Sequence, residues 1–164
     1  MASNEPSEPL EVQVGKLLTA RGLTVVAAES CTGGLILHRL TNVPGSSTYV
    51  LGGFVVYSNQ AKIKYADVSK DTLVRYGAVS AETAAEMAKG TRLAFGATAA
   101  LSVTGIAGPG GGTDTKPVGL TYIGLSTEDN LQVIRRVWAG DRESNKAQSA
   151  QAALELLYKW LTSR

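Results

Sequence analysis

The chain has 164 residues, of which 44% are hydrophobic and 18% are charged, a composition typical of one soluble globular domain with an apolar core. Sixteen lysines and arginines against fourteen aspartates and glutamates leave a formal net charge of +2, so charge favours neither nucleic acid nor a membrane as the main partner. One cysteine and one histidine exclude an internal disulfide and the usual zinc sites built from these residues. We therefore expect no metal.

The first residues differ in composition from the rest. Residues 1–9, MASNEPSEP, are polar, acidic and proline-containing, and they lack the basic start and the apolar stretch of a secretory signal. The sequence predicts a disordered tail over 1–9 and a single domain over 10–164. No stretch approaches the roughly 18 apolar residues that span a bilayer, and a lone cysteine is compatible with a reducing compartment. The predicted location is the cytoplasm.

Apolar periodicity, glycine stops and serine or threonine caps divide the domain into alternating helices and strands. Thr32 is placed to cap the helix after the SCTGG turn, and Ser69 is placed to cap a later helix. A further helix follows Ser80, with Glu82 near its start. The secondary structure of Asn59–Tyr65 is ambiguous in the sequence. In chain order the pattern predicts a helix from Leu10 to Gly22, a strand over Leu23–Ala28, a helix ending near Asn42, a strand over 50–57, helices over 69–76 and 81–95, a strand over 97–103, a hairpin of strands 118–125 and 131–138, and an amphipathic helix over 144–162.

This alternation predicts an α/β fold, a three-layer α/β/α sandwich whose sheet is mostly parallel but mixed because of the final hairpin. In open α/β sheets, ligands bind beyond the carboxyl ends of the strands. Three of the predicted strand ends are rich in polar residues or glycine. They are the stretches SCTGG at 30–34, YSNQAKIK at 57–64 and TGIAGPGGG at 104–112.

The first of these stretches places the Ser30 hydroxyl at a strand-to-helix turn, where free backbone N–H groups near Thr32 and Gly33 suit a phosphate or the oxyanion of acyl transfer. The alternative, to which the spacing gives equal weight, is that Ser30 or Thr32 serves only as a helix cap. Cys31 competes as nucleophile because a thiol at a helix N-terminus has a lowered pKa, although a lone cysteine is more often a buried small hydrophobe. His38 lies about two turns into the helix, which disfavours a Ser-His-acid triad.

The other two stretches offer a base and an anion-binding loop. A partly desolvated Lys62 could deprotonate a serine, with Tyr57 nearby, although most lysines are solvated surface charges. The glycine loop could aim several N–H groups at an anion, but it lacks the P-loop pattern, and a plain mobile loop is the alternative. Arg142 could hold a phosphate or pair with a neighbouring surface acid. The loop residues considered are Thr104, Gly105, Gly108 and Gly110.

Together, AESCTGG, GGFVVYSNQAKIK and SVTGIAGPGGGTDTKPVG resemble the CinA C-terminal domain family, and the resemblance runs from about Leu10 to the C-terminus. Enzymatic members of that family are nicotinamide-nucleotide amidases. The resemblance implies an α/β/α fold and cofactor-free hydrolysis of the carboxamide of nicotinamide mononucleotide, which gives nicotinate mononucleotide and ammonia. It implies Ser30 as nucleophile, Lys62 as base, Tyr57 and Thr104 as further active-site residues, and Arg142 as a basic residue of the site.

These roles satisfy the chemistry of amide hydrolysis, with backbone N–H groups as oxyanion donors and Tyr57 as the acid that protonates the leaving ammonia. Whether Arg142 or the glycine loop holds the substrate phosphate stays open. Two alternatives also stay open: a nucleotide-binding or regulatory module without turnover, and an amidase for another small carboxamide. The expected partners are the nucleotide substrate and a second copy of the chain, which could pair through the hairpin edge or the faces of Trp138 and Trp160.

Overall fold

The computed structural model describes residues 8–164, so the predicted disordered tail lies outside the described residues except for Glu8 and Pro9. Five strands form one sheet in the order β2-β1-β3-β4-β5. The strands are β1 (Val25–Glu29), β2 (Val50–Val55), β3 (Ala99–Gly105), β4 (Leu120–Ser126) and β5 (Leu131–Val137). β1 pairs in parallel with β2 and β3, whereas β4 is antiparallel to both β3 and β5. Only β4 therefore runs against the other strands, and the predicted mostly parallel, mixed sheet is confirmed.

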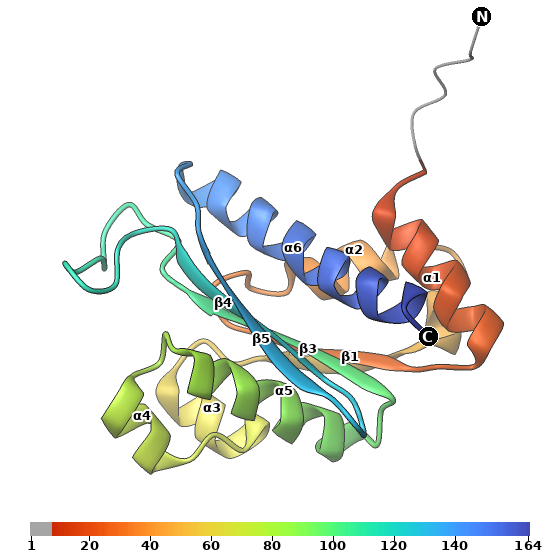
Figure 1. The fold of residues 1–164 in the computed structure, drawn as a ribbon, viewed down its shortest axis with the longest axis horizontal. Helices are drawn as coiled ribbons and strands as arrows, with labels where there is room; N and C mark the ends of the chain where they lie inside the picture. Colours follow the sequence, from red (N-terminus) through yellow and green to blue (C-terminus); the bar gives the residue numbers. More distant parts are fainter. Residues whose placement is uncertain (1–7) are drawn as a thin grey trace, which may run out of the picture.

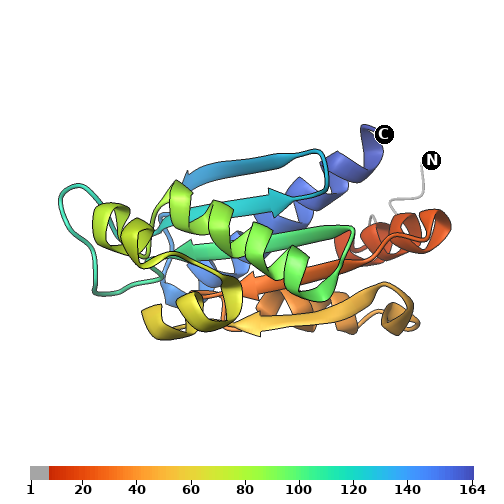
Figure 2. The same cartoon turned by 90° about the horizontal axis from the view of Figure 1, so that it is seen from below.

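Helices cover both faces of the sheet and form the outer layers of the predicted sandwich (Figures 1 and 2). One face is covered by α1 (Leu10–Arg21), α2 (Leu35–Thr41) and α6 (Arg142–Thr162). The other face is covered by α3 (Asn59–Ala66), α4 (Lys70–Tyr76) and α5 (Ala81–Phe95), and a short 3₁₀ helix, Ser46–Thr48, precedes β2. Within residues 8–164, none of these helices is both long and apolar enough to cross a bilayer.

Local capping explains where the helices on the second face begin. Ser69 accepts a hydrogen bond from the N–H of Thr72, which confirms the predicted cap. Ser80 caps α5 in the same way, through a hydrogen bond from the N–H of Thr83. The ambiguous segment is α3, which Ser58 caps in the same way. Its sequence shows little apolar periodicity because one of its inward-facing residues is a lysine.

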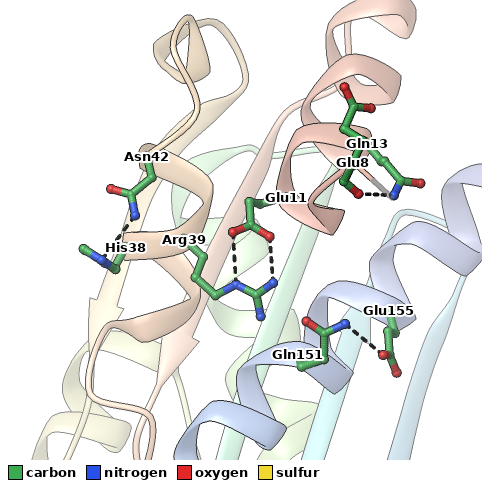
Figure 3. Close-up of polar contacts among 8 residues, drawn as sticks. All are labelled: Glu8, Glu11, Gln13, His38, Arg39, Asn42, Gln151 and Glu155. Atoms are coloured by element: carbon green, nitrogen blue, oxygen red, sulfur yellow. Dashed lines mark hydrogen bonds and ion pairs between the residues drawn. The ribbon is translucent and has the colours of Figure 1, made fainter. Parts of the chain in front are cut away.

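The helices of the first face pack on the sheet through a large apolar cluster that includes Leu154, Leu157 and Leu161 of α6. An ion pair also joins α1 to α2: Nη2 of Arg39 lies 2.7 Å from Oε2 of Glu11 (Figure 3). The hydrogen bond from Arg39 lowers the pKa of the Glu11 carboxyl below its ordinary value. These contacts fix α2, and with it the turn that enters it from β1.

On the second face, α3 packs against α5 at Gly90. A Cβ at Gly90 would lie 2.1 Å from the carbonyl oxygen of Ala66, the last residue of α3. In a helix without this contact, alanine would be more stable than glycine by about 1 kcal/mol. Here we expect Gly90→Ala to lower the free energy of unfolding by about 1 to 3 kcal/mol, measured by urea denaturation. Unchanged or increased stability would contradict this close packing.

Candidate active site

The three parallel strands end along one edge of the sheet (Figure 2), and predicted site residues stand at these ends. Ser30 follows β1, Tyr57 follows β2, and Thr104 and Gly105 end β3. The N–H of Ser30 donates to the carbonyl oxygen of Val103 at 2.9 Å. This hydrogen bond holds the backbone of Ser30 against β3 and so fixes the position from which its side chain extends.

Ser30 is in direct contact with Lys62, which belongs to α3, on the face of the sheet that α4 and α5 also cover (Figure 1). Nζ of Lys62 donates to Oγ of Ser30 at 2.9 Å, and both side chains are buried, with exposed fractions of 1% for Lys62 and 7% for Ser30. No ion pair involves Lys62 among the described residues. Burial therefore lowers the pKa of the Lys62 ammonium below its ordinary value of 10.5, since no facing carboxylate compensates the lost hydration.

Two main-chain carbonyl groups orient the amine of Lys62. Nζ donates to the carbonyl oxygens of Val56 at 2.9 Å and of Tyr57 at 3.2 Å. When Lys62 is neutral, its two N–H bonds can satisfy these carbonyls, and the nitrogen lone pair is then directed at the hydroxyl of Ser30. The geometry thus matches a general base facing its nucleophile.

Cys31 lies next to Ser30 but has a different environment. Its side chain is 6% exposed and belongs to the main apolar cluster. Burial raises the pKa of the Cys31 thiol to about 12, so the thiol stays protonated near neutral pH and is a poor nucleophile. The backbone N–H groups of Cys31 and Thr32 have no hydrogen-bond partner within residues 8–164. They directly follow Ser30 and are therefore the candidate donors to an oxyanion.

The predicted cap at Thr32 is wrong, because the carboxylate of Glu29 takes this role. Fully buried Glu29 accepts hydrogen bonds from three N–H groups at the start of α2. The donors are Gly34 at 3.1 Å, Ile36 at 3.0 Å and Leu37 at 2.9 Å. Gly33 and Gly34, with φ of 62° and 104°, extend the turn and make Gly34 the N-cap residue. Thr32 contributes only its carbonyl oxygen, which accepts from the N–H of Leu35 at 3.2 Å, and its hydroxyl caps no N–H group within residues 8–164. The signal that the sequence analysis missed is Glu29 itself, a carboxylate at the end of the apolar strand β1.

We expect Glu29→Gln to lower the free energy of unfolding by about 1 to 3 kcal/mol, because a carboxamide has one acceptor oxygen and its NH₂ group would face a backbone N–H. Urea denaturation measures this change. Glu155, an exposed residue of α6 whose carboxylate accepts from Gln151, offers a matched control: Glu155→Gln should change stability by less than about 0.5 kcal/mol. Equal effects of the two substitutions would refute the capping role of Glu29.

A small cavity of about 200 Å³ opens beside the Ser30–Lys62 pair. Arg142, at the start of α6, extends along its rim and donates to the carbonyl oxygen of Gly108 at 2.7 Å and to Oη of Tyr57 at 3.0 Å. The predicted site residues that line this cavity are Ser30, Tyr57, Lys62, Thr104, Gly105 and Arg142. The structure thus brings together residues from three strand ends and two helices.

The remaining predicted residues lie elsewhere. Thr32 and Gly33 line a neighbouring groove rather than the cavity. Gly108 contributes its carbonyl oxygen to Arg142, whereas Gly110 lies on an exposed part of the loop and does not line the cavity. His38, which the sequence disfavoured as a catalytic residue, is exposed and contacts Asn42 (Figure 3); it lines the neighbouring groove and not the cavity at Ser30.

Sequence reasoning missed three small residues that complete the cavity wall, because such residues carry no chemical signal. They are Ala78 and Val79, from the segment between α4 and α5, and Ala107. In the part of the chain that the structure describes, histidine, cysteine, aspartate and glutamate form no group of three or more that could hold a metal ion.

The fold and this site define an α/β/α sandwich protein with a buried serine–lysine pair at the carboxyl edge of its parallel strands. Residues 7–161 match the family model of the CinA C-terminal domain. The chain belongs to this family, as the three sequence stretches predicted.

The relatives carry names such as competence-damage inducible protein and CinA-like protein. A putative competence-damage inducible protein of Moorella thermoacetica is 51% identical over 157 residues, which are 96% of this chain and 38% of that protein. The crystal structure of a competence/damage inducible protein from Agrobacterium tumefaciens is 41% identical, with a TM-score of 0.90 and 93% of each chain covered. That of a CinA superfamily protein from Klebsiella pneumoniae is 32% identical, with a TM-score of 0.91 over 94% of this chain and 97% of that one. The chain thus matches the full domain in these structures but spans 38% of the Moorella protein.

Proposed function

We propose that this chain is a nicotinamide-nucleotide amidase, which hydrolyses the carboxamide of nicotinamide mononucleotide to nicotinate mononucleotide and ammonia. The observation that carries the proposal is the 2.9 Å contact between Ser30 and a buried Lys62. A lysine without a carboxylate partner and with a lowered pKa has the properties of a general base. The resemblance of the three sequence stretches to the amidase members of the family supplies the substrate.

In the proposed acylation step, neutral Lys62 takes the proton of Ser30 as Oγ attacks the carboxamide carbon. The N–H groups of Cys31 and Thr32 stabilise the oxyanion. The carbon–nitrogen bond then breaks, and the leaving nitrogen takes a proton from Tyr57, whose Oη is held by Arg142, so that ammonia departs. Proton exchange with Lys62 through the pocket restores the tyrosine hydroxyl.

In the second half-reaction, water attacks the acyl group on Ser30, and Lys62 serves again as the base. The bond between the acyl carbon and Oγ breaks, Ser30 regains a proton from Lys62, and nicotinate mononucleotide leaves. Each step uses residues of this chain and water, so the proposal includes no cofactor.

The size of the cavity indicates which part of the substrate it holds. Ligand pockets that enclose whole small molecules measure roughly 300 to 1,000 Å³, whereas this cavity measures about 200 Å³. We therefore assign it to the ring and its carboxamide, with the ribose phosphate outside the mouth.

Ammonia release from nicotinamide mononucleotide, nicotinamide riboside and free nicotinamide tests the proposal against its two alternatives. We expect the nucleotide to be hydrolysed with a much higher kcat/KM than the other two compounds, because its phosphate contributes binding that they lack. Similar rates for all three would favour an amidase for other small carboxamides. Binding of the nucleotide without ammonia release would favour a non-catalytic module.

We also propose a cytoplasmic location and self-association of the chain, without a nucleic-acid or membrane partner. Trp160 is 8% exposed and Nε1 of Trp138 donates to Ser149, so Trp160 offers little surface to a second copy. The outer edge of the sheet at β5, where Leu131 and Val137 are about half exposed, is the better candidate. Light scattering of the purified protein measures the oligomeric state.

A further inference from the structure

A second hollow adjoins the cavity at Arg142. It is a groove of about 690 Å³ between the turn that enters α2 and the first turns of α6. Arg142 lines both the groove and the cavity beside Ser30. A ligand with its ring at Ser30 can therefore extend past Arg142 and place a more distant group in this groove.

The charges that line the groove favour an anion. Lys146 is half-buried, and its ammonium makes no hydrogen bond or ion pair with any residue from 8 to 164. Arg142 donates only to neutral oxygens, those of Gly108 and Tyr57, so its positive charge is not compensated. Glu143 is the one acidic residue on the lining, and it is exposed. The two cations outweigh this screened carboxylate.

A buried hydroxyl on the same lining lacks a partner. Thr32 is 2% exposed, and its Oγ1 has no hydrogen-bond partner in the described part of the chain. An unsatisfied buried hydroxyl is costly, and a bound ligand with acceptor oxygens would satisfy it. Lys146 is close to this turn: a Cβ placed on Gly33 would lie 3.8 Å from its Nζ. The ammonium of Lys146 therefore lies beside the turn that carries the Thr32 hydroxyl, and both residues line the groove.

The backbone of the same turn is not the anion site. The carboxylate of Glu29 already accepts from the N–H groups of Gly34, Ile36 and Leu37, and its negative charge lies beneath the turn. An anion in the groove must therefore be held by side chains. Gly110 of the glycine loop, the other candidate clamp in the sequence, lines neither hollow.

We propose that this groove binds the phosphate monoester of the nucleotide substrate, with Lys146 as the cation and the Thr32 hydroxyl as a donor. This inference rests on the proposed function for the identity of the nucleotide. It assigns the phosphate to α6 and the turn after β1 rather than to the glycine loop. Arg142 lies between the ring and the phosphate.

Kinetics of Lys146→Met on nicotinamide mononucleotide and on its riboside test this assignment. We expect the variant to raise KM for the nucleotide by about tenfold to a hundredfold, since a hydrogen bond to a charged group is lost, with kcat little changed. Its kinetics on the riboside should equal those of the wild type. Two control variants should match the wild type on both substrates: Lys159→Met, on an exposed site near the end of α6, and Lys116→Met, in the segment after the glycine loop. A selective loss in Lys116→Met, or an equal effect of Lys146→Met on both substrates, would overturn the assignment.

Binding of inorganic phosphate provides a readout that does not need turnover. In ¹⁵N-edited NMR spectra at low ionic strength, phosphate should shift the amide signal of Gly33 in the wild type, and Lys146→Met should weaken this titration about tenfold or more. The signal of Gly110 should not move. Phosphate shifts at Gly110 and none at Gly33 would refute the site. If phosphate binds at Gly33 but the nucleotide is not hydrolysed, the amidase proposal fails while the anion site stands.

Discussion

Replacing Ser30 with alanine is expected to lower kcat for ammonia release from nicotinamide mononucleotide by at least about 1,000-fold, because the proposed covalent path loses its nucleophile. The Ser30 side chain makes one hydrogen bond, from Lys62, and alanine differs from serine only by the hydroxyl group, so the variant should still fold. A coupled assay for ammonia measures the rate, and circular dichroism checks the fold.

Cys31→Ala is the matched control for this experiment, because it removes the neighbouring candidate nucleophile. With a thiol pKa of about 12, Cys31 is protonated under assay conditions, so the variant should retain activity within a few-fold of the wild type. The serine mechanism would be contradicted by the reverse pattern, in which Cys31→Ala is inactive and Ser30→Ala is active.

The second large effect is expected from Lys62→Met, which keeps an unbranched side chain but removes the base. General-base catalysis contributes about 100-fold to 10,000-fold, and kcat should fall by that factor. In the wild type, kcat/KM should rise with pH as Lys62 loses its proton, with a midpoint below the ordinary lysine value of 10.5 because burial lowers this pKa. Lys62→Met should lose this rising limb. A wild-type profile that is flat until about 10.5 would argue against Lys62 as the base.

The same pKa shift predicts how stability depends on pH. Between the lowered pKa of Lys62 in the folded state and the value of 10.5 in the unfolded chain, the unfolded state binds more protons, so the free energy of unfolding rises with pH in this window. Below the folded pKa, burial of the charged amine costs stability. Urea denaturation across the window should show this slope in the wild type and a smaller one in Lys62→Met; identical slopes would contradict the shift.

Apart from α3, which was ambiguous in the sequence, the order and type of the helices and strands followed from local signals in the sequence. Ser69 and Ser80 cap their helices through side chains that bond within three residues, and such contacts are readable from spacing. The start of α2 was not predictable in this way, because it depends on two glycines with positive φ and on Glu29. Because Glu29 lies before the turn and α2 begins after it, the spacing between this capping residue and its helix differs from that of an ordinary N-cap and cannot be recognised in the sequence.

The site shows the same division between local and tertiary information. Ser30 and Lys62 were identified as candidates from residue type and from the family resemblance, but their 2.9 Å contact depends on β1 and β2 being neighbours in the sheet. Gly110 was grouped with the site because glycine repeats suit anions in general, yet the loop extends away from the cavity.

The central claim is tested most directly by incubating the purified protein with nicotinamide mononucleotide and measuring both products, beside Ser30→Ala as the blank. We predict ammonia and nicotinate mononucleotide in equal amounts from the wild type, and neither above background from Ser30→Ala. Nucleotide binding by the wild type without either product, or equal turnover by the two proteins, would contradict the proposed serine–lysine amidase.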